Sequence, residues 1–270
     1  MTQENNRRPI AVTMGDPAGI GPEVIVKALV SKRLAGYSDL LIIGDIRVLR
    51  LAAAQLGSPV NFTPITESAV DAEDWRSADG AVRVLDLANA DPESFPVGKV
   101  SAVAGRASME AIEVATRLAL AGTASAMVTA PINKEATAAA GYHDIGHLEY
   151  LARVTGATEY ATMLVTGRLR VVHLSTHYSL REACDRVTRG AVLGKVRLTH
   201  RSFRSWGLEA PRIGVAALNP HGGEGGMFGR EEIDEIAPAV EEARAEGIDA
   251  RGPYPADSIF NRAIDGEFDA

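Results

Sequence analysis

Short runs of β-branched and other apolar residues alternate with longer amphipathic runs along most of this chain, and this alternation limits its fold more than any other feature. Strands are expected at 10–14, 40–43, 82–85, 126–129 and 213–218, and helices at 21–34, 47–56, 108–121, 191–206 and 231–246. Residues 163–165 and 170–174 are expected to form a hairpin around Thr166-Gly167. Alternating strands and helices are typical of an α/β fold, with a largely parallel sheet covered on both faces.

Two local patterns refine this prediction in the second half of the chain. Ser179-Leu-Arg-Glu182 has the spacing of a capping box, in which the serine and glutamate side chains satisfy amides at a helix start. Pro238 lies inside the expected helix 231–246, where it either kinks the helix or opens its second part. The length suits two α/β lobes, expected at 1–140 and 141–270.

Charge and cysteine content exclude several classes of protein. The 28 Lys and Arg residues are outnumbered by 35 Asp and Glu residues, and the basic residues form no cluster along the sequence. Nucleic acid is therefore not an expected partner. The single cysteine, Cys184, rules out an intramolecular disulfide and suits a reducing cytoplasm. No stretch approaches the roughly 20 apolar residues of a membrane helix, and the start MTQENNRRPI has no apolar signal core. A soluble, cytoplasmic protein is therefore expected.

The segment Met14-Gly-Asp-Pro-Ala-Gly-Ile-Gly-Pro-Glu23 follows the first expected strand. Its glycines let the backbone approach a ligand, and the amides of a helix N-terminus attract anions. The glycine spacing differs from the dinucleotide fingerprint. It matches that of short-chain dehydrogenases, but none of the six tyrosines has a lysine four residues later, which excludes that class. The segment is either an anion-binding loop or a tight turn, and Asp16 is either a ligand contact or a turn residue.

The segment Thr129-Ala-Pro-Ile-Asn-Lys134 follows another expected strand. Ligands of open α/β sheets collect at the carboxyl ends of strands. Lys134 therefore either holds a carboxylate or phosphate, or is simply solvated.

Three of the six histidines lie at strand ends or in loops rich in glycine. They are His147 in Gly146-His147-Leu-Glu149, His177 after the hairpin, and His221 in Asn219-Pro-His-Gly-Gly-Glu-Gly-Gly226. Imidazole is the commonest ligand of catalytic divalent metals. Taken singly, each histidine suits an ordinary surface or core role better than the role of a metal ligand. The three are far apart in the sequence, so only the fold can bring them together.

Taken together, five segments resemble the 4-hydroxythreonine-4-phosphate dehydrogenase family. They occur in the family's order: Gly15–Glu23, Thr129–Lys134, Gly146–Glu149, Asn219–Gly226 and Gly252-Pro-Tyr-Pro-Ala-Asp257. The resemblance covers essentially the whole chain. Gly44-Asp45, Pro131-Ile-Asn-Lys134 and Ser179-Leu-Arg-Glu-Ala-Cys-Asp185 look more like the branch acting on D-threonate or D-erythronate 4-phosphate than like the branch of pyridoxine biosynthesis.

The resemblance implies a two-lobed fold like that of isopropylmalate dehydrogenase, assembled as a homodimer. It implies NAD or NADP as cofactor, and a divalent metal (Zn, Mg, Co, Ni or Mn) held by three histidines, of which His177 and His221 match two. The substrate-binding positions are matched by Asp16, His147 and Leu148. Lys134 and Asp257 are expected to be catalytic, Lys134 by holding a substrate anion and Asp257 as a carboxylate near the metal. Taken alone, Asp257 suits a helix N-cap after Pro255 slightly better.

Two departures from the family pattern affect this expectation. Leu148 stands where the family usually has threonine, so one hydroxyl contact to the substrate is lost. By the family's spacing, the third histidine belongs to a Tyr-His-Asp-Gln segment a few residues beyond Ala270. The C-terminal part, with most of the cofactor site, is therefore expected to be missing, and residues 266–270 are expected to lead into a strand.

The implied reaction is the oxidation of a small 4-phosphorylated 3-hydroxy acid, with hydride transfer to NAD and decarboxylation of the resulting β-keto acid. Two alternatives stay open. One is a dehydrogenase of an unphosphorylated dihydrodiol carboxylate, which Leu148 favours. The other is a non-catalytic binding or dimerisation module of the same fold.

Overall fold

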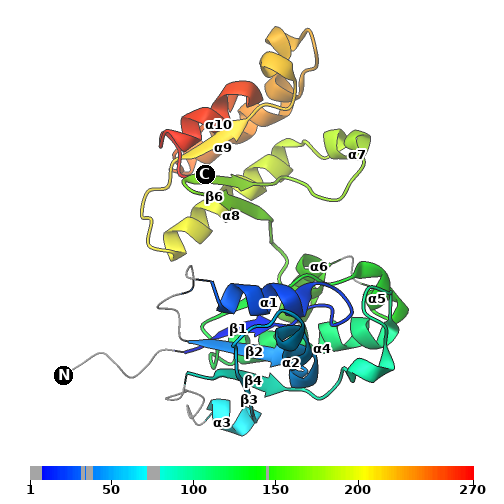
Figure 1. The fold of residues 1–270 in the computed structure, drawn as a ribbon. Helices are drawn as coiled ribbons and strands as arrows, with labels where there is room; N and C mark the ends of the chain where they lie inside the picture. Colours follow the sequence, from blue (N-terminus) through cyan, green and yellow to red (C-terminus); the bar gives the residue numbers. More distant parts are fainter. Residues whose placement is uncertain (1–7, 32–33, 35–38, 72–79, 144–145) are drawn as a thin grey trace, which may run out of the picture. The chain divides into compact units, whose positions relative to one another are not determined.

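The chain divides into two compact units, Met1–Leu151 and Ala152–Ala270, in a computed structural model that describes residues 8–31, 34, 39–71, 80–143 and 146–270 (Figure 1). The sequence predicted a division between residues 140 and 141. The observed division falls later because α6 (His147–Thr155) begins in the first unit, where Tyr150 packs with Met109 and Ile112 of α4 (Ala102–Leu120).

The first unit is built on a five-stranded parallel sheet with the strand order β3-β4-β2-β1-β5. Its strands are β1 (Ile10–Thr13), β2 (Leu40–Gly44), β3 (Phe62–Ile65), β4 (Val82–Asp86) and β5 (Ala126–Thr129). In the central strand β2, Leu41 and Ile43 join one core cluster and Ile42 joins the other. An uninterrupted apolar run suits a strand that is covered on both faces. The prediction of a largely parallel α/β fold is confirmed.

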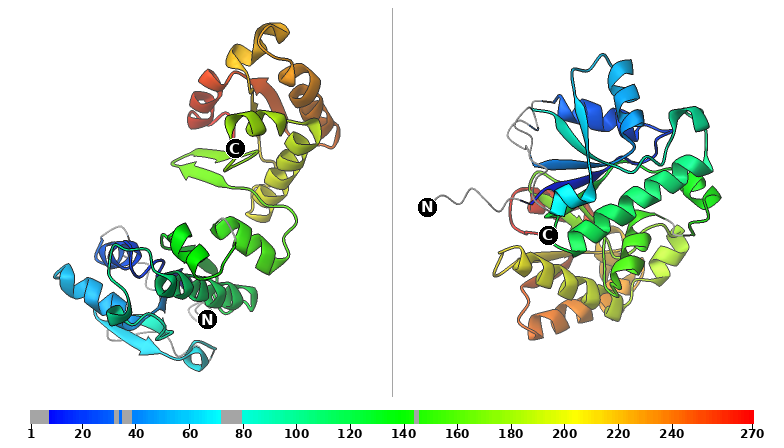
Figure 2. Two further views of the ribbon diagram at one scale, coloured as in Figure 1. Left: turned by 90° about the vertical axis from the view of Figure 1, so that its right-hand side faces the viewer. Right: turned by 90° about the horizontal axis from the view of Figure 1, so that it is seen from below.

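Helices cover both faces of this sheet (Figure 2). The helices α1 (Gly21–Leu29) and α2 (Ile46–Gln55) pack on the face of Ile42, whereas α4 and α3 (Glu67–Asp71) pack on the face of Leu41 and Ile43. The short segments of the unit are η2 (Pro92–Ser94) and α5 (Lys134–Ala139), and α5 lies against α4. The sequence predicted α1 to reach residue 34, but this helix ends at Leu29. Part of the predicted extension, residues 32–33, lies outside the described residues.

The second unit contains two small sheets. The strands β6 (Met163–Thr166) and β7 (Leu169–Val172) form the predicted antiparallel hairpin, and β8 (Ile213–Ala216) pairs in parallel with β9 (Ala250–Tyr254). Its helical segments are α7 (Leu180–Asp185), α8 (Arg189–Ser205), η3 (Pro220–Gly226), η4 (Glu232–Ile236), α9 (Ala237–Ala245) and α10 (Ala256–Ile264). Apolar side chains of α8, α9, β8 and β9 form its main core.

Both local sequence patterns of this unit are confirmed. Ser179 and Glu182 form the two reciprocal hydrogen bonds of a capping box at the start of α7. Pro238 lies in the first turn of α9, directly after the π-helical segment η4, so it opens the second part of the predicted helix.

The last residues lie along β8, where the Gly214 amide donates to the Ala270 carbonyl oxygen at 2.9 Å. Among the described helices, none is long and apolar enough to cross a membrane.

Candidate active site

Two of the sequence motifs meet at the carboxyl edge of the first unit's sheet. The strands β1 and β5 are neighbours, so the loops that follow them lie together. The Asp16 amide donates to the Pro131 carbonyl oxygen at 2.9 Å. Gly15 has a φ of +72°, and a Cβ atom at this position would lie 2.5 Å from the same oxygen. Only glycine fits this approach, so Gly15 sets the distance between the two loops.

Asp16 is a buried residue that closes the turn after β1. Its carboxylate accepts a hydrogen bond from the Ala18 amide at 2.9 Å, which is typical of an Asx-turn. Burial raises the pKa of Asp16, and hydrogen bonds from the amides of Ala18 and Gly19 oppose that rise. The structure thus gives Asp16 the turn role, and a contact with substrate remains a prediction.

Lys134 and His147 come together beside Gly146. The Cε atom of Lys134 lies 3.7 Å from where a Cβ of Gly146 would stand. Lys134 is exposed at the start of α5, and Asn133 caps this helix by accepting from the Ala136 amide at 3.0 Å. The neighbouring Leu148 is half-buried.

The imidazole of His147 has an unusual environment. Its Nε2 atom is buried and has no hydrogen-bond partner among the described residues. Burial, followed by the positive charge of Lys134, lowers the pKa of His147. A buried polar atom without a partner is rare, and next to a lysine it would be satisfied by an anionic oxygen.

Helix α4 holds both of these loops in place. The Ser108 hydroxyl donates to the carbonyl oxygens of Gly15 at 3.1 Å and Ala104 at 2.8 Å. One turn earlier, Gly105 lies so close to α5 that a Cβ atom would stand 2.0 Å from the Ala136 carbonyl oxygen. The two residues therefore fix the turn of Asp16 and the helix of Lys134 against one rigid element.

Replacing Gly105 with alanine is expected to destabilise the protein by about 1–3 kcal/mol. The methyl group meets backbone atoms, which cannot move aside, and this cost exceeds the gain of about 1 kcal/mol in helix propensity. The matched control is Gly194→Ala in α8, where a Cβ meets nothing within 4 Å and a small stabilisation is expected. Denaturant unfolding of both variants measures the difference; equal stabilities would show that α4 and α5 are not closely packed.

In the second unit, the loop after β8 presents His221 to solvent. Its side chain is 66% exposed, and its Nδ1 atom lies 3.0 Å from the Glu224 Oε1 atom. A histidine that binds a metal through one ring nitrogen usually forms a hydrogen bond from its other ring nitrogen to a carboxylate, which orients the ring. In His221 this second nitrogen is Nδ1, which leaves Nε2 for the metal. The local geometry of His221 therefore fits a metal ligand.

His177 and Asp257 lie on other segments of the same unit. His177 is exposed between β7 and α7 and has a φ of +62°. Asp257 is exposed in the first turn of α10; the N-cap is Pro255, so the interpretation of Asp257 as N-cap is wrong. Helix α10 contacts η3, the segment of His221. In the part of the chain that the structure describes, no three His, Cys, Asp or Glu side chains gather into a metal site. A metal site that includes both His177 and His221 therefore remains a prediction.

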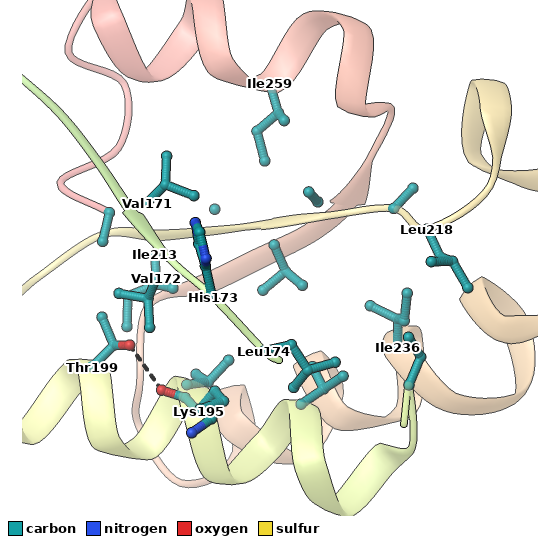
Figure 3. A pocket seen from close by; sticks show the side chains of 18 of the residues that line it. Val171, Val172, His173, Leu174, Lys195, Thr199, Ile213, Leu218, Ile236 and Ile259 are labelled. Atoms are coloured by element: carbon teal, nitrogen blue, oxygen red, sulfur yellow. Dashed lines mark hydrogen bonds between the residues drawn. The ribbon is translucent and has the colours of Figure 1, made fainter. Parts of the chain in front are cut away.

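The second unit also contains a cavity of about 500 Å³ (Figure 3). Its walls come from β7, β8, α8 and α10, and most of the lining side chains are apolar. His173 and Lys195 are two lining residues with titratable side chains. The Lys195 ammonium group donates to the Tyr160 carbonyl oxygen at 2.5 Å, and burial lowers the pKa of Lys195. None of the predicted site residues of this unit, His177, His221 or Asp257, lines the cavity. The sequence pattern gave no indication of it.

A parallel sheet with two neighbouring loops and a lysine–histidine pair at its carboxyl edge is typical of a ligand-binding α/β fold. Residues 37–270 match the family described as Pyridoxal phosphate biosynthetic protein PdxA. The D-threonate 4-phosphate dehydrogenase of Cupriavidus necator is 44% identical over 261 residues, which cover 96% of this chain and 77% of that protein. The 4-hydroxythreonine-4-phosphate dehydrogenase of Beijerinckia indica is 46% identical over 262 residues, which cover 97% and 75%.

Solved structures show the same likeness. A 4-hydroxythreonine-4-phosphate dehydrogenase from Klebsiella pneumoniae superposes with a TM-score of 0.88 at 41% identity, covering 97% of this chain and 79% of that one. A terephthalate 1,2-cis-dihydrodiol dehydrogenase from Burkholderia xenovorans reaches 0.62 at 29% identity, covering 98% and 78%. The chain belongs to the PdxA family of dehydrogenases. The predicted family and the predicted oxidoreductase class are confirmed.

Proposed function

We propose that the protein oxidises a small 4-phosphorylated 3-hydroxy acid, with NAD or NADP as hydride acceptor and a divalent metal, and that oxidation is followed by decarboxylation. The relatives are named for D-threonate 4-phosphate and 4-hydroxythreonine 4-phosphate, which supports this substrate class. The observation that carries the proposal is the buried, unpartnered Nε2 atom of His147 beside Lys134. The proposal includes a cytoplasmic homodimer.

The residues of the chain take the following roles in this proposal. Lys134 and His147 hold the substrate phosphate, and Leu148 lies beside them. Asp16 fixes the loop after β1 and contacts the substrate. The imidazoles of His177 and His221 are two ligands of the metal (Zn, Mg, Co, Ni or Mn), and Asp257 supplies a nearby carboxylate. When bound, the metal lowers the pKa of the substrate hydroxyl and the nicotinamide accepts the hydride.

Sulfate, which stays a dianion at neutral pH, tests the Lys134–His147 pair directly. The pKa of His147 lies below its ordinary value, so the free imidazole is neutral near pH 7. A bound dianion favours the charged imidazolium, so binding takes up a proton. Sulfate is therefore expected to bind more tightly as the pH falls from 7.5 towards 6.5, by at most about tenfold per pH unit.

Calorimetry in two buffers of different ionisation enthalpy measures this proton uptake. His147→Asn is expected to abolish the uptake, whereas His143→Asn, at an exposed histidine of the same unit, is expected to retain it. Sulfate binding by the wild-type protein without proton uptake would contradict the assignment of His147.

An unphosphorylated dihydrodiol carboxylate is the second candidate substrate. Leu148 favours it, and so does the likeness to the terephthalate dihydrodiol dehydrogenase. NAD reduction with phosphorylated and unphosphorylated forms of threonate, erythronate and hydroxythreonine, and with a dihydrodiol carboxylate, separates the two. Faster turnover of the phosphorylated acids is expected.

Leu148→Thr restores a hydroxyl group next to the phosphate. One neutral hydrogen bond contributes about 0.5–1.5 kcal/mol, so kcat/KM for the phosphorylated acid is expected to rise about 2- to 10-fold. Leu148→Val is the control, because valine has nearly the same shape as threonine but no hydroxyl group. It is expected to give no such rise. If valine and threonine act alike, Leu148 does not face the phosphate.

A further inference from the structure

The loop that presents His221 has an unusual backbone. All five residues from His221 to Gly225 have positive φ values, between +46° and +78°. His221 and Glu224 are not glycines, and each such residue costs about 1–3 kcal/mol in this region. A strained loop of this kind persists only where neighbouring groups hold it.

Glu232 is the buried side chain that holds the start of this loop. It is 4% exposed, on η4. Its Oε1 atom accepts hydrogen bonds from the amides of Leu218 at 2.8 Å and Asn219 at 2.7 Å. Its Oε2 atom accepts from the Asn219 Nδ2 atom at 2.9 Å. These donors belong to the two residues that immediately precede Pro220 and His221.

The same carboxylate also lies under the middle of the loop. A Cβ atom at Gly223 would stand 2.9 Å from the Glu232 Oε2 atom, so only glycine allows the loop to close over it. Burial alone would raise the pKa of Glu232, but the hydrogen bonds from the Asn219 side chain and the backbone amides outweigh it and hold the pKa below its ordinary value. Glu232 is therefore a charged anchor whose oxygens are occupied by the loop.

We infer that Glu232 is a positioning residue for His221, holding the loop so that the His221 imidazole stays available to a divalent cation. It acts through Leu218, Asn219 and Gly223 and does not bind the cation itself. The inference rests on the proposed function, in which His221 is a metal ligand. It adds a residue that the sequence pattern did not indicate, since Glu231-Glu232 with Asp234-Glu235 suggests a solvated acidic helix face.

Glu232→Gln tests this role, with Asp234→Asn as the matched control. Both changes remove one negative charge from η4, but Asp234 is exposed and pairs with Arg230. Glutamine keeps the shape but turns an N–H group towards the Asn219 Nδ2 atom, so one acceptor is lost. Zn²⁺ affinity, measured in competition with a chelator, is expected to fall about 10- to 100-fold in Glu232→Gln and to stay unchanged in the control.

The second readout is hydrogen exchange of the Leu218 and Asn219 amides by NMR, without metal. Loss of hydrogen-bond strength is expected to speed exchange by roughly tenfold in Glu232→Gln and not in Asp234→Asn. A merely structural role would lower the melting temperature without changing Zn²⁺ affinity. Unchanged Zn²⁺ affinity in folded Glu232→Gln would overturn the inference.

Two further measurements keep the outcome decisive. If Glu232→Gln does not fold, Asn219→Ala removes the side-chain donor to Glu232, together with its hydrogen bond to Glu231, and is expected to weaken Zn²⁺ binding as well. Unchanged affinity there overturns the inference. If Zn²⁺ binding by the wild-type protein does not depend on His221, the metal assignment of the proposed function fails, and the exchange rates alone show whether Glu232 holds the loop.

Discussion

Alanine in place of His221 is expected to lower the Zn²⁺ affinity of the protein by more than about 100-fold. Loss of a group that only orients a metal ligand typically costs 10- to 100-fold, and loss of the ligand itself costs more. Metal-dependent NAD reduction is expected to fall with the affinity. Titration with Zn²⁺ against a chelator measures the first effect, and absorbance of NADH measures the second.

Glu224→Gln makes this experiment quantitative. Glu224 only orients the ring of His221 through its Nδ1 atom, at 3.0 Å, so its loss is expected to have a smaller effect than His221→Ala. His143→Ala, at an exposed histidine of the other unit, serves as the control for general loss of surface imidazole. If His221→Ala binds Zn²⁺ as tightly as His143→Ala, His221 is not a ligand.

Replacing Lys134 with glutamine is expected to weaken sulfate binding about 10- to 150-fold, because a hydrogen bond to a charged group contributes roughly 1.5–3 kcal/mol. The same loss is expected in kcat/KM for the phosphorylated substrate and not for its unphosphorylated form. The fold is expected to be unchanged, since Lys134 is exposed and α5 is capped by Asn133.

Lys27→Gln is the matched control for this change. Lys27 is exposed on α1 in the same unit and pairs only within its own helix, with Glu23, among the described contacts. Sulfate binding is expected to be normal in this variant. Equal binding in the two variants would show that Lys134 is solvated and holds no anion.

Long apolar elements were predictable from the sequence, because their burial leaves a pattern in the chain. The strand β2 is buried on both faces and is a continuous apolar run, and its predicted position differs by one residue from the observed one. Helix α4 was predicted to start at Ser108 but starts at Ala102. Its first turns pack against α5 through small residues such as Gly105, and small residues do not produce the spacing of large apolar side chains that identifies a helix. Strand β3 was missed because Thr63 and Pro64 interrupt its apolar residues, and proline argues against a strand. Helix α5 has only alanines as apolar residues and therefore shows no clear apolar face.

The site was predictable only where the sequence carried the chemistry itself. Lys134 and His147 were identified by residue type, and the structure brings them together. The burial of the His147 Nε2 atom and the hydrogen bond from Ser108 to Gly15 depend on tertiary packing. The spacing of residues along the sequence does not reveal such packing. Glu232 was missed for the same reason, because a buried carboxylate and a solvated one have identical sequence patterns.

The most direct test of the proposed function is the stoichiometry of the reaction. The protein is freed of metal with a chelator and then given NAD, D-threonate 4-phosphate and one divalent metal at a time. The proposal predicts one NADH and one carbon dioxide for each substrate molecule consumed, with both products depending on added metal. NADH formed at the same rate without metal, or no turnover of any 4-phosphorylated hydroxy acid by folded protein that binds both metal and sulfate, would contradict it.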